Sequence, residues 1–175
     1  MIFSETKLNG AYLIEIEKFE DIRGFFARSF CGKEFEAKGL NPHVAQCNVS
    51  FNPHKGTVRG MHYQSPSAEA KLVRCTKGAI YDVIIDLRPE SPTFREHFGT
   101  VLSEENRSML YIPEMFAHGF QTMEDNSEVF YQMSEFYIPE NSRGVRWDDP
   151  AFGICWPDEI KIISERDRTY PDFIL

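Results

Sequence analysis

Apolar and polar residues alternate with a period of two along most of the chain, the pattern of strands that bury one face. The clearest example is segment 57–64, TVRGMHYQ, where alternation places His62 on one face and Arg59 on the other. Similar short segments, separated by Gly, Pro, Asn and Asp, span 11–18, 25–30, 44–51, 71–76, 79–87, 98–102, 108–112, 117–123 and 128–137. This spacing predicts an all-β sandwich or barrel.

Few segments depart from the strand pattern. Residues 33–38, KEFEAK, precede Gly39 and predict one short surface helix, and residues 19–24, FEDIRG, predict a polar turn. The Lys77-Gly78 pair between two apolar runs predicts a hairpin. The chain becomes irregular beyond Trp147 and contains no repeat or linker, so we expect one domain over residues 1–175.

Composition indicates a folded protein without nucleic acid as its main partner. Apolar residues make up 42% of the chain and aromatic residues 14%, and the 15 Phe and 7 Tyr favour strands. The net charge is −8 without a basic run, whereas surfaces that follow phosphates are usually basic.

The segments typical of export or membrane insertion are also missing from the sequence. The start, MIFSETKLNG, lacks a basic region followed by an apolar run, and no apolar run approaches the roughly 18 residues of a membrane helix. None of the four cysteines (Cys31, Cys47, Cys75 and Cys155) forms a C-x-x-C pair. We therefore expect a cytoplasmic protein with reduced thiols and no membrane partner.

Candidate chemistry is concentrated between residues 55 and 71. Arg59, His62 and Lys71 lie close together on predicted strands, which suggests an anionic ligand beside a group that transfers protons. The same pattern is equally consistent with a half-buried core histidine flanked by surface cations. Alternation places Gln46 and Asn48 on one face with Ser50, where they either face water or bind a sugar or base.

Several kinds of site are disfavoured by the motifs. A jelly-roll metal centre usually carries His-x-His, but His62 is followed by Tyr63-Gln64, and His118 is the only other histidine well placed on a predicted strand. The chain contains no G-x-S-x-G elbow, no G-x-G-x-x-G loop and no Walker A lysine. Acid/base chemistry by His, Tyr, Lys and Asp remains.

The motifs together resemble one enzyme family along nearly the whole chain. They are RGFFARSF (23–30), QCNVS (46–50), RGMHYQ (59–64), KLVR (71–74), SPTF (91–94), LSEEN (102–106), YIPEMFAHGF (111–120), EVFYQ (128–132), RGVRWDDPAFGICWP (143–157) and SERD (164–167). In this order they resemble the dTDP-4-dehydrorhamnose 3,5-epimerase family.

The resemblance implies a cupin-type jelly roll (double-stranded β-helix) with a few short peripheral helices. It also implies a homodimer in which N-terminal strands pair into the neighbour's sheet, and no metal or organic cofactor. The implied substrate is a nucleotide-diphospho-4-keto-6-deoxyhexose, which the family inverts at C3 and C5.

The same resemblance implies a role for individual residues. His62 matches the catalytic base, Asp167 its carboxylate partner, Tyr131 the acid on the opposite face, and Lys71 the cation near the C4 oxygen. His118 matches a residue of the sugar pocket. The residues that match the nucleotide end are Arg23, Gln46, Asn48, Arg59 and Arg166. Taken without the family, Tyr131 is equally an ordinary strand residue, Asp167 a turn cap and Arg166 a solvated charge.

Three departures from the family pattern leave the nucleotide open. Arg28 stands where the family often has a glutamate that contacts the base, and Phe136-Tyr137 stands where it often has Tyr-Tyr. The loop between His62 and Lys71 is one residue shorter than usual. Two alternatives therefore remain: a single-centre (C3 or C5) epimerase on a differently linked sugar such as a CDP-sugar, and a non-catalytic jelly roll that binds sugar nucleotides.

Overall fold

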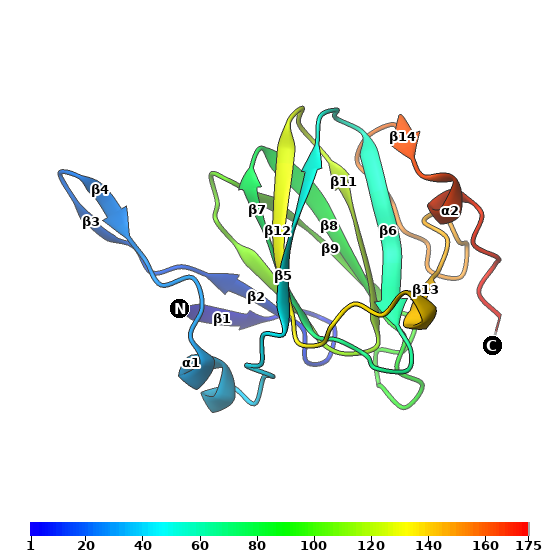
Figure 1. Ribbon diagram of the computed structural model, residues 1–175, viewed down its shortest axis with the longest axis horizontal. Coiled ribbons are helices and arrows are strands. Elements are labelled where there is room, and N and C mark those ends of the chain that lie inside the picture. The colour runs from blue at the N-terminus through cyan, green and yellow to red at the C-terminus, as the bar shows by residue number, and fades with distance from the viewer. Residues whose placement is uncertain (175) are drawn as a thin grey trace.

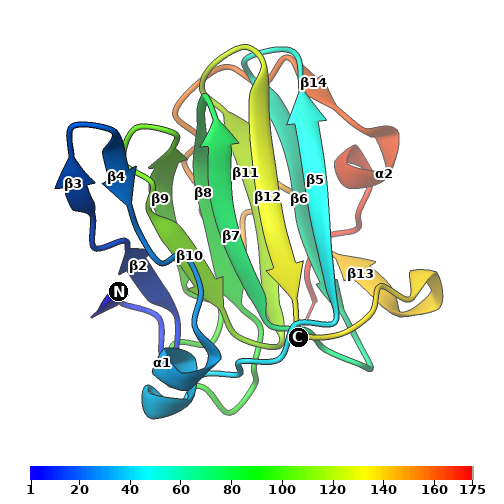
Figure 2. The same cartoon turned by 60° about the vertical axis from the view of Figure 1, so that its left-hand side comes forward.

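Two β-sheets packed face to face form the body of the molecule (Figures 1 and 2). This computed structural model describes residues 1–174. The first sheet has the spatial order β1-β2-β10-β7-β12-β5 and is antiparallel throughout. Its strands are β1 (Ile2–Glu5), β2 (Tyr12–Glu15), β5 (Gln46–Asn52), β7 (Lys71–Lys77), β10 (Met109–Ile112) and β12 (Ser127–Met133).

The second sheet has the order β13-β6-β11-β8-β9, and β14 pairs in parallel with β6. Its strands are β6 (Thr57–Gln64), β8 (Ala79–Asp86), β9 (His97–Ser103), β11 (Phe116–Thr122), β13 (Ser142–Gly144) and β14 (Ile162–Ile163). The helices are short: α1 (Gly32–Ala37), the 3-10 turn η1 (Pro139–Asn141) and α2 (Glu165–Arg168). The all-β fold predicted from the sequence is confirmed.

Apolar side chains fill the space between the sheets and cover their outer faces. Val73 and Leu110 of the first sheet pack with Ile84 of the second, all fully buried. Phe35 of α1 packs on the outer face of the first sheet, and Phe152 of the irregular segment after β13 packs on the second. The helix predicted on the surface is thus present, with one side in a core.

The predicted hairpin at Lys77-Gly78 is wrong. β7 and β8 belong to different sheets, so the chain crosses between the layers at this point. Gly78 has φ +69°, and a Cβ there would lie 2.7 Å from the hydroxyl of Ser127. The glycine therefore permits a tight crossing, which local sequence does not distinguish from a hairpin turn.

The N-terminal region also differs from the prediction. Residues 19–24 form not only a turn but also β3 (Phe19–Asp21), which pairs with β4 (Gly24–Phe26), so the strand predicted over 25–30 is mostly irregular. The β3–β4 hairpin projects away from both sheets (Figure 1). Phe19, Ile22 and Phe26 are each at least 70% exposed. A cluster of large apolar side chains in water is unfavourable and is typical of a surface that binds another protein.

An irregularity in β6 changes which side chains share a face. His118 pairs with His62 but Phe120 pairs with Arg59, so the register of β6 against β11 shifts between them. Gly60 lies at this β-bulge with φ +118°, and a Cβ there would lie 2.5 Å from the Cα of Gly119. The bulge brings Arg59 and His62 to the same cavity, so the opposite faces predicted from strict alternation are wrong.

Candidate active site

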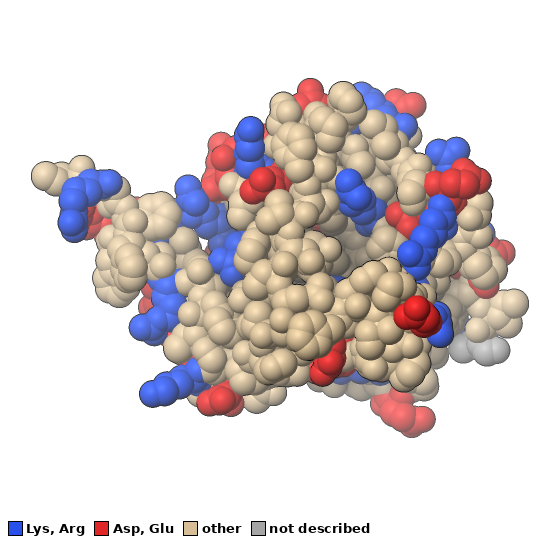
Figure 3. Space-filling view, in the orientation of Figure 1, with Lys and Arg blue, Asp and Glu red and all other residues tan. Residues whose placement is uncertain are grey.

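A cavity of about 840 Å³ opens between the sheets, with β5 on one side and β6 on the other. The space-filling view in Figure 3 shows the hollow on the face between these two strands. Residues 162–164, Arg166 and Asp167 close it on the β6 side. The volume lies within the range that binds small molecules and cofactors.

His62 and Asp167 form an imidazole–carboxylate pair in the cavity. His62 Nε2 lies 2.6 Å from Asp167 Oδ1, and Asp167 Oδ2 accepts a bond of 3.3 Å from the Gly60 amide. The Ser164 hydroxyl caps α2 by accepting a hydrogen bond from the Asp167 amide. This cap fixes the helix that carries the carboxylate. Burial opposes ionisation, but the bond to His62 and the Gly60 amide outweigh it and hold the pKa of Asp167 below its ordinary value.

A second imidazole–carboxylate pair lies next to the first. His118 on β11 pairs in register with His62, and its Nε2 lies 2.9 Å from Oδ2 of Asp82 on β8. Asp82 is fully buried, which raises its pKa against the opposing effects of His118 and Lys71. His62 and His118 therefore each have a carboxylate partner of their own. Within residues 1–174, no three His, Cys, Asp or Glu side chains are grouped so that they could hold a metal ion.

Lys71 and Tyr131 enter the cavity from the first sheet. In the register of β7 against β12, Lys71 lies opposite Met133 and Tyr131 opposite Val73, so the two side chains are diagonal neighbours on one face. Lys71 Nζ lies 2.5 Å from Oε1 of Glu69, and both side chains are less than 10% exposed. Burial raises the pKa of Tyr131, so its phenol stays protonated at neutral pH.

Polar groups continue along the cavity from this point. Gln46 and Asn48 of β5 share a face, as the alternation predicted, and both line the cavity. Gln46 Nε2 donates to Asn48 Oδ1 at 3.2 Å. The two guanidinium groups on the β6 side are Arg59, which donates to Asn52 at 2.6 Å, and Arg166. The cavity thus presents acid/base groups together with amides and guanidinium groups.

Comparison with known proteins identifies the family. The model of the dTDP-4-dehydrorhamnose 3,5-epimerase family matches residues 5–174. The chain belongs to the dTDP-4-dehydrorhamnose 3,5-epimerase family. Epimerases are isomerases, so the protein is an enzyme of that class. The cupin-type jelly roll expected from the sequence is the fold of this family, and it is confirmed here.

Individual epimerases cover nearly the full chain. The dTDP-4-dehydrorhamnose 3,5-epimerase of Methanothermobacter thermautotrophicus is 44% identical over 96% of this chain and 92% of its own. The crystal structure of the epimerase from Elizabethkingia anophelis superposes with a TM-score of 0.96 at 38% identity, covering 99% of this chain and 96% of its own. That from Bacillus anthracis, with TDP and PPi bound, gives 0.94 at 41%, covering 98% and 99%.

A single-centre enzyme is also among the structural neighbours of this epimerase family member. ChmJ, a 3'-monoepimerase from Streptomyces bikiniensis in complex with dTDP-quinovose, superposes with a TM-score of 0.87 at 34% identity. It covers 95% of this chain and 85% of its own. The shared fold therefore does not decide between one inverted centre and two.

Two arginines of this epimerase lie outside the cavity of their own chain. Arg23 is on the β3–β4 hairpin, where it pairs with Asp21, and its side chain is 86% exposed. Arg28 follows β4 and pairs with Glu34 at 2.5 Å. The structure thus gathers every other candidate residue and leaves Arg23 apart within one chain.

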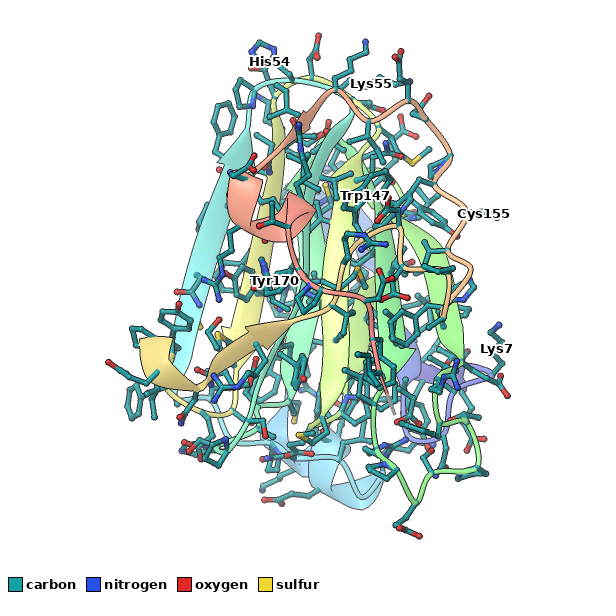
Figure 4. The ribbon with its side chains drawn as sticks, turned by 90° about the vertical axis from the view of Figure 1, so that its right-hand side faces the viewer. Lys7, His54, Lys55, Trp147, Cys155 and Tyr170 are labelled. Carbon is teal, nitrogen blue, oxygen red and sulfur yellow. The ribbon has the colours of Figure 1, made fainter. Side chains whose placement is uncertain are left out.

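Three groups that contact the candidate site residues were not expected from the sequence. They are Asp82, Glu69 and Tyr170. Glu69 lies two residues before Lys71, a spacing that already places both on one side of an extended segment. Tyr170, which follows α2 (Figure 4), lay in the irregular region; its ring meets His62 edge-on at a centroid distance of 6.3 Å.

Proposed function

We propose that this enzyme inverts C3 and C5 of a dTDP-linked 4-keto-6-deoxyhexose, with His62 as base and Tyr131 as acid. One observation carries the proposal. His62 on β6 and Tyr131 on β12 line the same cavity from opposite sheets, and Lys71 lines it as well. An inversion needs a base on one face of the sugar ring and an acid on the other.

The geometry of His62 favours Nδ1 as the basic nitrogen. Its Nε2 is engaged by Asp167, which keeps the proton of the neutral ring on that side. In each inversion Nδ1 takes the proton from the carbon beside the ketone, and the C–H electrons form an enolate whose charge lies on the C4 oxygen. Asp167 stabilises the resulting imidazolium, as the carboxylate does in hydrolase triads.

Lys71 and Tyr131 complete the reaction. The ammonium group of Lys71 stabilises the enolate oxygen, an effect of about 3 kcal/mol for a preorganised donor. The phenol of Tyr131 gives its proton to the carbon from the opposite face, which reforms the ketone with inverted configuration. The phenolate regains a proton and the imidazolium loses one through solvent, so no net proton is consumed.

The remaining polar groups suit the nucleotide end of such a substrate. Guanidinium forks bind diphosphate oxygens, and Arg59 and Arg166 supply two of them in the cavity. Gln46 and Asn48 supply amides for the base, and the half-exposed ring of Tyr137 at the cavity is available for stacking. The names of the relatives and the TDP bound to the Bacillus anthracis enzyme support dTDP as the nucleotide.

The functional unit that we propose is a homodimer. The apolar β3–β4 hairpin projects from its own chain, and β5 is an edge strand whose Val49 and Phe51 are 61% and 49% exposed. Pairing of the hairpin with a second copy would bury these surfaces. It would also bring Arg23 to the neighbour's nucleotide, the role that the family resemblance assigns to it.

Solvent isotope uptake tests the function. The dTDP-, CDP-, GDP- and UDP-linked 4-keto-6-deoxyglucose compounds are incubated with the enzyme in D2O and followed by proton NMR. We expect deuterium at both C3 and C5, with inversion, and fastest for the dTDP sugar. Uptake at one carbon would establish a single-centre epimerase, the activity named for the neighbour ChmJ. Tight binding without uptake would establish a binding protein.

A further inference from the structure

We propose that Glu69 is a positioning residue of this site, whose carboxylate holds the ammonium group of Lys71 toward the sugar and places a negative charge near Tyr131. The inference rests on the proposed function of Lys71 and Tyr131. Oε1 of Glu69 lies 2.5 Å from Nζ of Lys71, and their side chains are 4% and 8% exposed. Both residues line the cavity.

The backbone fixes where Glu69 can place its carboxylate. The amide of Ala70, between Glu69 and Lys71, donates to the Ser134 hydroxyl at 2.8 Å, and the Ala70 carbonyl accepts the Ser134 amide at 2.9 Å. These two bonds extend the pairing of β7 with β12 by one residue. Glu69 and Lys71 therefore lie on the same side of an anchored extended segment.

The ion pair determines the position of an otherwise flexible group. A lysine side chain has four rotatable bonds, and ordering it costs roughly 2 kcal/mol of side-chain entropy. Within residues 1–174, Glu69 is the one carboxylate that forms an ion pair with Lys71. A buried ammonium group must be compensated, so the carboxylate stabilises its charge and also restricts it to one place. That place must match the enolate oxygen for the charge to act.

The charge of Glu69 also acts on the proposed acid. Burial is the largest cause of the raised pKa of Tyr131, Arg59 opposes it, and the charge of Glu69 adds to it, as does Tyr137. Lys71, His62 and His118 line the same cavity. Without the carboxylate we expect the pKa of Tyr131 to fall, so that the phenol loses its proton at a lower pH.

Two substitutions separate position from charge. Glu69→Gln removes the charge and keeps the shape, and we expect kcat for isotope uptake to fall about 10- to 100-fold with little change in KM, because the ammonium group is no longer held. The alkaline limb of its pH–rate profile moves to lower pH. Glu69→Asp keeps the charge but retracts it by one methylene, so we expect a lowered kcat with the alkaline limb at the wild-type position.

Controls and a readout independent of activity complete the test. Glu128→Gln removes a carboxylate on β12 that bonds Thr76 at 2.8 Å, and it should leave both kcat and profile unchanged. Tyr131 is also titrated by NMR in 13C-tyrosine-labelled enzyme without substrate, with Tyr131→Phe to assign its signal. This readout holds even if wild-type enzyme shows no isotope uptake on any sugar nucleotide, a result that would contradict the proposed function alone.

Four results would overturn the inference or one part of it. Wild-type kcat in folded Glu69→Gln enzyme would show that the carboxylate merely compensates a buried charge. A faster rate would show that it weakens the field of Lys71 rather than positioning it. An unchanged Tyr131 titration in Glu69→Gln enzyme would remove the effect on the acid. If Glu69→Gln fails to fold, wild-type kcat in Glu69→Asp enzyme overturns the positioning role.

Discussion

Nε2 of His62 and Oδ1 of Asp167 lie 2.6 Å apart, although 105 residues separate them in the chain. His62 is in the middle of a sheet strand, and Asp167 is on a four-residue helix capped by Ser164. Their contact joins the sandwich to the segment that follows it. The first two predictions test what this contact does for catalysis and for stability.

Asp167→Asn should lower the rate of isotope uptake by about 10²- to 10⁴-fold, because an amide neither stabilises an imidazolium nor holds the same tautomer. Binding of dTDP should change by less than about threefold, because Asp167 lies at the His62 end of the cavity. NMR uptake rates and calorimetry with dTDP measure the two effects. A rate within a few-fold of wild type would exclude Asp167 as the partner of the base.

The same variant should reveal a pH-dependent contribution to folding. The pKa of Asp167 in the folded protein lies below its ordinary value near 3.9, so the carboxylate stabilises the fold at pH values above that range. The stability is lost as pH falls through the folded pKa. The difference in free energy of unfolding between wild type and Asp167→Asn should thus be full at pH 7 and shrink below about pH 5.

Urea unfolding at a series of pH values measures this difference. Asp148→Asn is the matched control, because Asp148 is 46% exposed and pairs with Arg146 at the surface. Its effect should be small at every pH, since exposed ion pairs contribute about 0–1 kcal/mol. A wild-type advantage that does not shrink in acid would contradict the linkage.

His62→Ala and Tyr131→Phe should fail in different ways. Without His62 no group removes the proton, so uptake of deuterium stops at both carbons while dTDP still binds. Without the Tyr131 hydroxyl, His62 can still remove a proton and return deuterium to the same face. We therefore expect Tyr131→Phe enzyme to exchange hydrogen without inversion. Inverted product from Tyr131→Phe enzyme at a near-normal rate would assign the acid elsewhere.

Gly60→Ala should destabilise the protein by about 2–4 kcal/mol and reduce activity further, because its Cβ would collide with the backbone of Gly119 at the bulge. Gly24→Ala is a close control: Gly24 has φ +119° but no atom within 4 Å of the added Cβ. Urea unfolding should show a larger loss for Gly60→Ala. Equal losses would mean that backbone conformation, not the close approach, makes glycine necessary.

Arg23→Ala and His62→Ala should complement each other in mixed dimers. If Arg23 acts in the neighbour's site, one of the two sites in a mixed dimer carries both changes and the other carries none. Co-expression should then restore isotope uptake that neither variant shows at low substrate. The control is a mixture with His62→Ala/Arg23→Ala chains, which have no intact site to offer to Arg23→Ala partners. Absence of restored activity in a purified mixed dimer would place Arg23 outside the shared site.

Sequence reasoning located β6 at its observed bounds because the 57–64 alternation is strong and is bounded by glycine and proline turns. It also placed Gln46 and Asn48 on one face, since β5 is regular. It failed at Arg59 because a bulge breaks the period of two: Gly60 and Met61 of β6 lie opposite the single residue Gly119 of β11. It failed at Gly78 because a hairpin and a crossing between sheets use the same short turn.

Contacts between segments far apart in the chain could not be predicted from local sequence patterns. Nothing near Asp167 in the sequence indicates that its helix reaches His62, and the family motifs alone suggested the pair. The two carboxylates Glu69 and Asp82 were missed for a related reason. Each is one acidic residue in an apolar or mixed segment, and only the packed fold reveals the ammonium group or imidazole that it meets.

The position of its neighbours in the chain determines when β6, the strand that carries His62, can first form its backbone hydrogen bonds. All its partners in the described chain, β11, β13 and β14, follow it by more than fifty residues. During synthesis on the ribosome, β6 therefore emerges with both edges unpaired and with Val58 and Met61 still in contact with water. Chains truncated before β11 should aggregate rather than accumulate as a folded N-terminal half, and the full chain should fold slowly for its size.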